Sequence, residues 1–115
     1  MRRSSRLTRS DDIKSVRQEG HSFAHPSIVL GVLPNQLEKN RIAIVAGRSV
    51  GGAVQRNFAK RRIRSAFQGL QTKLHQGYDL VLIARKPILD IHYQLLLETL
   101  SSLLERAGLM KDEVN

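Results

Sequence analysis

The stretch Ala53-Val-Gln-Arg-Asn-Phe-Ala-Lys-Arg-Arg-Ile-Arg64 lies at the centre of this chain and mixes apolar with basic residues at helical spacing. The apolar residues continue beyond it at intervals of three and four, which is the pattern of one buried helix stripe. The stripe comprises Ala59, Ile63, Ala66, Phe67, Leu70 and Leu74. We therefore predict a long helix that begins near Ala53 and ends at Gly77, because glycine commonly terminates helices.

The same region contains all of the net positive charge of the chain. Residues 39–78 hold nine of the 19 basic residues and no acid, whereas the remaining residues hold ten basic and ten acidic side chains. The nine basic residues are Lys39, Arg41, Arg48, Arg56, Lys60, Arg61, Arg62, Arg64 and Lys73. The positive charges of such a block repel one another unless a polyanion lies against them. This distribution of charge indicates a nucleic-acid partner.

Four polar residues of the predicted helix share one face, next to the apolar stripe. They lie at positions i, i+3, i+4 and i+7, and are Asn57, Lys60, Arg61 and Arg64. No acid along the helix can neutralise them, and the planar arginine fork suits phosphate oxygens. The pattern favours a phosphate-binding face, and the alternative is a helix face that is simply solvated.

The rest of the chain predicts a single α+β domain with one sheet covered by helices. A first helix runs from Ser10 to Gly20, and a last helix is capped by Asp90 and ends at Gly108. Apolar runs predict three strands, at residues 28–33, 42–46 and 80–84. Asp79 and Asp90 are interpreted as turn and cap residues, and residues 1–9 as a flexible basic arm.

Composition excludes several classes of protein. The chain has no cysteine, which rules out disulfides and thiolate zinc sites. It has no apolar run of about 18–20 residues, as a membrane span requires, and no secretory signal, so we expect a cytoplasmic protein without a membrane partner. Aromatic residues make up only 4%, which argues against stacking bases on several rings.

No group of residues predicts a catalytic centre, a metal site or a small-molecule site in the protein itself. The four histidines lack metal-ligand spacing, and no carboxylate pair or nucleophile–histidine arrangement stands out. The segment Gly47-Arg48-Ser49-Val50-Gly51-Gly52 lacks the lysine of a mononucleotide loop. Its glycines fit either a phosphate contact or a flexible turn between strand and helix.

The central motif resembles the signature of the protein subunit of bacterial ribonuclease P. It reads Arg56-Asn57-x-x-Lys60-Arg61-x-x-Arg64, preceded by Val50-Gly51-x-Ala53-Val54. Three further segments are similar to that family: Leu7 to Gly20, Arg41-Ile42-x-Ile44, and Asp79-Leu-Val-Leu-Ile-Ala-Arg-Lys-Pro87. The resemblance thus spans nearly the whole chain.

The resemblance implies a fold and a function. The fold has a four-stranded sheet and three helices, in the order helix, three strands, helix, strand, helix, with a left-handed crossover against the usual rule. The function is to bind the catalytic RNA subunit and the 5′ leader of precursor tRNA, which the RNA cleaves. Mg²⁺ is then held mainly by the RNA subunit and the substrate, and the protein supplies no catalytic residue.

Two groups of site residues follow from the resemblance. Residues expected to bind the RNA subunit are Arg48, Arg56, Asn57, Lys60, Arg61, Arg62 and Arg64. Residues expected in the leader cleft, between the sheet and the first helix, are Ile13, Arg17, Arg48 and Lys86.

The chain departs from the family pattern at several positions. Phe58 stands where the family usually has arginine, and Gly47-Arg48-Ser49 where it usually has Ser-Lys-Lys. Ile13 and Arg17 stand where aromatic residues are frequent, and Gly31 where a tyrosine is frequent. We therefore predict that leader recognition depends on charge more than on base stacking.

Three other functions remain open at this stage. A structural RNA-binding protein of ribosomal type would have the same charge profile, and only the Arg56–Arg64 signature argues against it. A DNA-binding regulator is disfavoured because strands, rather than a short turn, separate the first two helices. A free-standing nuclease is disfavoured by the absence of a carboxylate cluster.

Overall fold

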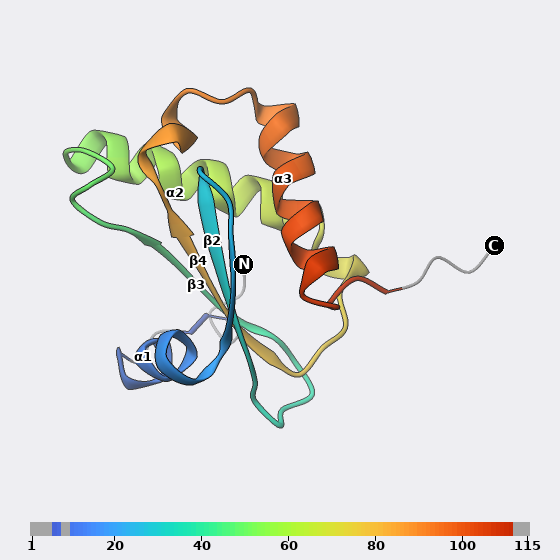
Figure 1. Cartoon of the computed structure of the whole chain (residues 1–115). Helices are drawn as coiled ribbons and strands as arrows, with labels where there is room; N and C mark the ends of the chain where they lie inside the picture. The colour runs from blue at the N-terminus through green and yellow to red at the C-terminus, as the bar shows by residue number, and fades with distance from the viewer. Residues whose placement is uncertain (1–5, 8–9, 112–115) are drawn as a thin grey trace.

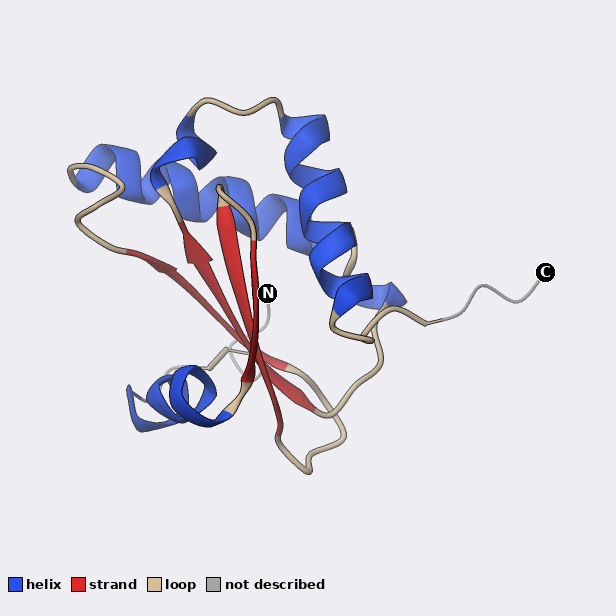
Figure 2. Cartoon of the chain, viewed as in Figure 1, coloured by secondary structure: helices blue, strands red, loops and turns tan. Residues whose placement is uncertain are grey.

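The computed structural model describes residues 6–7 and 10–111 of the chain (Figure 1). The helices and strands follow the order helix, three strands, helix, strand, helix, with two additional 3₁₀ turns (Figure 2). They are α1 (Ser10–Glu19), β1 (His21–Ala24), β2 (Ile28–Pro34), β3 (Arg41–Ala46), α2 (Ala53–Gln68), η2 (Gln71–Lys73), β4 (Tyr78–Ala84), η3 (Lys86–Leu89) and α3 (Tyr93–Arg106). The predicted α+β class is confirmed.

The four strands form one mixed sheet in the order β1-β2-β4-β3. β2 pairs antiparallel with both β1 and β4, whereas β3 pairs parallel with β4. A parallel pair needs a crossover connection, and α2 supplies it between β3 and β4. The carboxyl ends of β3 and β4 therefore lie at the same edge of the sheet, with Ala46 opposite Ala84.

Helices cover both faces of the sheet (Figure 1). On one face α2 and α3 form the main core, because their apolar stripes pack on alternate residues of the strands, such as Leu30, Ile42 and Leu82. On the other face α1 packs through Val16 against a smaller cluster that includes Ala43 and Val81. α1 covers only part of its face, and Val45 and Ile83 there are left half-buried.

α2 ends earlier than the sequence predicts. The helix stops at Gln68, with Gly69 as its C-cap, and not at Gly77. Leu70 and Leu74 nevertheless stay buried, because the η2 turn folds them back onto the core. Gly77 has a φ of 102° and forms the tight turn into β4, so its conformational freedom serves the strand entry.

The last helix begins at Tyr93, with His92 as N-cap, and Asp90 does not cap it as predicted. Asp90 instead closes η3, a 3₁₀ turn that Pro87 near its start favours. The guanidinium of Arg62 on α2 donates hydrogen bonds of 2.6 Å to the carbonyl oxygens of both Ile88 and Ile91. This contact between α2 and the β4–α3 connection explains why α3 begins later.

Residues 1–9 are predicted to be a flexible basic arm, and the structure describes two of them, Arg6 and Leu7, which pair with the sheet. Arg6 forms a parallel bridge with Ile42, and the backbone N–H of Leu7 donates to Ile42 O at 2.8 Å. The Leu7 side chain is buried in the cluster beneath α1. These two residues therefore extend the sheet beyond its edge strand β3, and the rest of the predicted arm lies outside the described residues.

Gly20 ends α1 at a position where a side chain has no room. A Cβ atom there would overlap the carbonyl oxygen of Val32 and lie 2.6 Å from that of Val16, and both are backbone atoms. We expect Gly20→Ala to lower the free energy of unfolding by about 1–3 kcal/mol, as overpacking usually does. Urea denaturation checks this, with Gly47→Ala as the control, because a Cβ at Gly47 meets nothing within 4 Å.

Candidate nucleic-acid interface

The polar face of α2 forms a groove on the protein surface, which we call the signature groove. It is lined by Val54, Asn57, Lys60, Arg61 and Arg64. The structure thus brings together the four polar residues that the helical spacing places on one face. The groove contains three cations and no acidic residue, so its electrostatic potential favours a polyanion.

Arg64 occupies a special position in this groove. Its Nε atom is buried and has no hydrogen-bond partner among the described residues. A buried donor without a partner is costly, so an acceptor supplied by a bound molecule would relieve that cost. Arg64 also lines a second groove, which runs along β3.

The second groove lies between α1 and the edge strand, and we call it the α1–β3 groove. Its lining combines apolar side chains with two arginines, and comprises Arg6, Leu7, Ile13, Ile42, Ala43, Ile44, Val45 and Arg64. Ile13 is the one predicted leader-cleft residue in this lining. Arg6 and Arg64 are far apart in the sequence, so only the tertiary structure brings these two cations into one groove.

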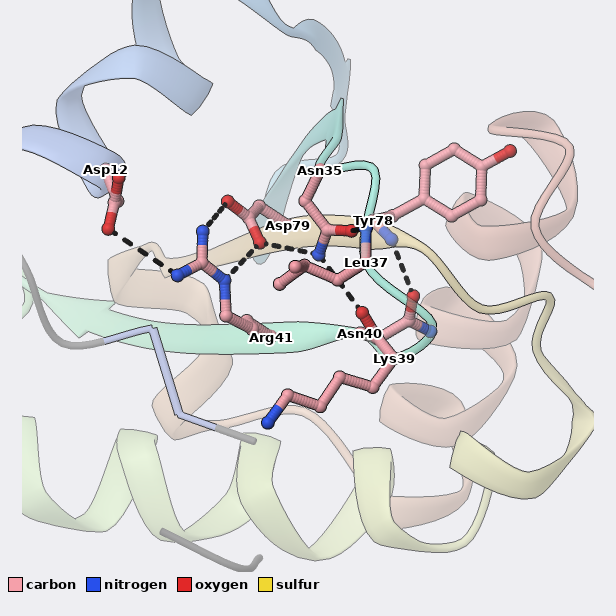
Figure 3. Close-up of polar contacts among 8 residues, drawn as sticks. All are labelled: Asp12, Asn35, Leu37, Lys39, Asn40, Arg41, Tyr78 and Asp79. Atoms are coloured by element: carbon pink, nitrogen blue, oxygen red, sulfur yellow. Dashed lines mark hydrogen bonds and ion pairs between the residues drawn. The ribbon is translucent and has the colours of Figure 1, made fainter. Parts of the chain in front are cut away.

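Arg41 is a basic residue that two acids neutralise in three dimensions, although both of them lie far from it in the sequence. Its Nε and Nη2 donate to the two carboxylate oxygens of Asp79 at 2.8 and 2.7 Å, and its Nη1 lies 3.7 Å from Asp12 Oδ2 (Figure 3). The hydrogen bonds that Arg41 donates to Asp79, together with the negative charges of Asp79 and Asp12, raise the pKa of Arg41 above its usual value, although burial opposes this. Arg41 is therefore part of the scaffold.

Asp79 is correspondingly a buried residue of a strand and not the turn residue predicted. It lies within β4, is 5% exposed, and also accepts a hydrogen bond of 2.9 Å from Asn35 Nδ2. Nearby, Asn40 Oδ1 accepts from the backbone N–H of Tyr78 at 2.9 Å (Figure 3). These contacts join the β2–β3 loop to the start of β4 and hold α1 against the sheet through Asp12.

Arg62 also has intramolecular partners. Two of its nitrogens bind the carbonyl oxygens of Ile88 and Ile91, and its guanidinium lies over the Phe58 ring at 5.5 Å from the centroid. Arg62 does not line the signature groove, and neither does Arg56, which is half-buried on α2. The structure therefore separates these two residues from the other helical candidates.

The remaining predicted residues lie at two separate places. Arg48 is exposed in the β3–α2 loop, and Lys86 is exposed at the start of η3. Both follow the carboxyl ends of the parallel strands β3 and β4, and therefore lie at one edge of the sheet. Arg17 is exposed on α1, beside Val16, which packs over Gly31 in the middle of β2. The lining of the α1–β3 groove includes none of the three.

Sequence reasoning missed Arg6 as a candidate binding residue. Its only signal was its position in a basic terminal segment, and the bridge to Ile42 that positions it joins residues far apart in the chain. The sequence pattern also did not predict that the Val54 side chain would be 78% exposed and line the signature groove.

Residues 6–7 and 10–111 contain no group of three or more histidines or acids that could hold a metal ion. Within the same residues no helix is long and apolar enough to cross a membrane.

The fold and the grooves define the class of this protein as a single α+β domain that presents a basic helix face. A family model described as Ribonuclease P matches residues 1–108. The ribonuclease P protein component of Chloroflexus aurantiacus is 40% identical over 116 aligned residues, covering 100% of this chain and 86% of the relative. That of Symbiobacterium thermophilum is also 40% identical, over 98% of this chain and 99% of the relative.

The solved structures with a similar fold are also ribonuclease P proteins. The ribonuclease P protein of Staphylococcus aureus superposes with a TM-score of 0.82 at 27% identity, over 93% of this chain and 98% of that one. The ribonuclease P protein from Thermotoga maritima gives a TM-score of 0.79 at 30% identity, over 88% of this chain and 96% of that one. This chain belongs to the family of bacterial ribonuclease P protein components.

Proposed function

We propose that this protein binds the RNA subunit of ribonuclease P through the signature groove and the 5′ leader of precursor tRNA through the α1–β3 groove. Membership of the family makes it a subunit of an RNA-based endoribonuclease that processes precursor tRNA. The RNA and the substrate would hold the catalytic Mg²⁺, and the protein would raise the affinity of the complex for both.

The observation that best supports RNA binding is the contrast between two kinds of basic residue. Arg41 and Arg62 have their nitrogens occupied by Asp79 and by backbone carbonyls. In the described part of the chain, Lys60, Arg61 and Arg64 form no ion pair, and they lie together in one groove. A folded protein that leaves these cations unneutralised in one place is suited to neutralising phosphates.

Leader binding is supported by the form of the α1–β3 groove. Its lining is largely apolar and includes two arginines, a combination that suits a single strand with exposed bases and a charged backbone. None of the lining residues is aromatic, which agrees with recognition that depends on charge. Arg64 lines both grooves, so the two RNA partners would be bound side by side.

A reconstitution experiment tests the function. The purified protein is mixed with the RNA subunit from the same source, and cleavage of precursor tRNA at the mature 5′ end is measured at low Mg²⁺. We expect strong stimulation by the protein and no cleavage by the protein alone. RNA binding without any stimulation would instead support a structural RNA-binding role, and cleavage by the protein alone would make it a nuclease.

Arg17 is exposed on α1 outside the lining of the α1–β3 groove, and it tests whether the leader extends from that groove along α1, because only precursor tRNA carries the leader. We expect Arg17→Ala to weaken the affinity of the reconstituted complex for precursor tRNA and to leave that for mature tRNA unchanged. The loss should shrink as salt rises, because an exposed phosphate contact is screened. Lys39→Ala, which removes an exposed cation from the β2–β3 loop, is the matched control. An equal loss for both tRNAs would place Arg17 outside the leader site.

A further inference from the structure

Phe58 is an exposed aromatic residue beside the signature groove. It lies on α2 and is 39% exposed, whereas Phe67 is fully buried in the core and Phe23 packs partly buried against it. On a helix, Phe58 is a neighbour of Val54 at i−4 and of Arg61 at i+3, and both of these line the groove. The ring therefore continues the basic groove with an apolar surface.

The Phe58 ring is held in place by Arg62, which is anchored to the β4–α3 connection. The Arg62 guanidinium lies over it at 5.5 Å from the ring centroid, and is itself fixed by hydrogen bonds of 2.6 Å to Ile88 O and Ile91 O. A guanidinium anchored in this way limits the motion of the ring at little further entropic cost. Arg62 thus acts as a support for the ring.

Aromatic rings and arginine planes are the surfaces on which proteins stack unpaired RNA bases. Leaving part of a phenylalanine ring in contact with water is unfavourable, and here the neighbouring cations would bring RNA phosphates close to the ring. Tyr93, which is also 39% exposed, has its hydroxyl hydrogen-bonded to Ser65 at 2.7 Å on the flank of the same helix. Phe58 instead lies on α2 itself, three and four positions from groove residues.

We propose that Phe58 stacks against an unpaired base of the RNA subunit when the signature groove binds that RNA. The inference rests on the proposed function, because the groove must first receive the RNA. It assigns Phe58 a contact with a base, whereas Lys60, Arg61 and Arg64 contact phosphates.

A fluorescence experiment tests the contact directly. The chain contains no tryptophan, so Phe58→Trp introduces a single tryptophan, whose emission can be excited separately from that of the two tyrosines. We expect its emission to be quenched when the RNA subunit is added, because the indole stacks on a base. The matched control is Leu37→Trp, at a residue 44% exposed in the β2–β3 loop, where emission should not change.

An affinity measurement complements it. Phe58→Leu keeps the apolar bulk but removes the aromatic face, and we expect RNA binding to weaken roughly 5- to 150-fold. The slope of log affinity against log salt should stay the same, since no phosphate contact is lost. Phe58→Tyr should keep the wild-type affinity, and thermal unfolding shows whether each variant is folded.

The outcomes separate this inference from the function on which it rests. Quenching at Phe58→Trp together with weaker binding by Phe58→Leu supports stacking. Unchanged emission while the RNA binds, or wild-type affinity in Phe58→Leu, overturns the stacking and leaves the proposed function intact. No binding of the RNA by the wild-type protein contradicts the proposed function itself.

Discussion

Reversing Lys60 and Arg64 to glutamate is expected to abolish tight binding of the RNA subunit. Both residues line the signature groove, and a hydrogen bond to a charged group is worth about 1.5–3 kcal/mol. Losing two such contacts should weaken binding roughly 10²- to 10⁴-fold, before any repulsion by the new carboxylates is counted. The slope of log affinity against log salt should fall by roughly 1.4–1.8, and titrations at several salt concentrations measure both effects.

The matched control for this variant is Lys73→Glu with Lys111→Glu. It changes the net charge by the same amount, but its two residues line a different cavity, between η2 and the end of α3. If this control weakened binding as much, only the overall charge would matter and the signature groove would not be the binding site. Circular dichroism must show that both variants are folded, which matters for Arg64 because its Nε is buried.

Removing the carboxylate of Asp79 is expected to have the second large effect, on stability. Breaking a fully buried ion pair costs roughly 3–5 kcal/mol, because the remaining charge is left unpaired. The Arg41 side chain is 26% exposed, and water can solvate part of its charge, so we expect Asp79→Asn to lower the free energy of unfolding by about 2–3 kcal/mol. Urea denaturation measures this, with Asp90→Asn as control, since Asp90 is exposed.

A double mutant distinguishes the ion pair from simple packing. Adding Arg41→Gln to Asp79→Asn removes the unpaired charge, so the double variant should be more stable than Asp79→Asn alone. Arg41→Gln should also leave RNA affinity unchanged under conditions where the variant is folded, because the guanidinium is already occupied. A clear loss of RNA affinity there would show that Arg41 contacts RNA and does not serve only the scaffold.

Local periodicity in the sequence was sufficient to predict much of the fold. The start of α2 at Ala53, the extent of α1, and the apolar runs of β2, β3 and β4 all follow from patterns within a few residues. The common face of Asn57, Lys60, Arg61 and Arg64 follows in the same way, because helix geometry alone determines it. β1 was not predicted by such a pattern, since its four residues include only one that is even partly buried.

Tertiary structure decided which cations are available to a partner. The sequence shows nine basic residues without an intervening acid, but the parallel pairing of β3 and β4 places Asp79 opposite Arg41, and α1 adds Asp12. The packing of α2 near η3 similarly directs Arg62 to two carbonyl oxygens. In the same region His92, and not the predicted Asp90, is the N-cap of α3. These contacts join residues that are 26 to 38 positions apart, so no local pattern could indicate them.

The same reason explains the second groove. Arg6, Ile13 and Arg64 belong to three segments that meet only because the chain before α1 pairs with the edge strand β3 and α2 crosses the opposite face. Hydrophobic and helical periodicity are properties of neighbouring residues, and the sequence by itself therefore determined the basic face of α2. Strand pairing and helix packing are properties of distant residues, and only the folded chain determined where that face meets the α1–β3 groove.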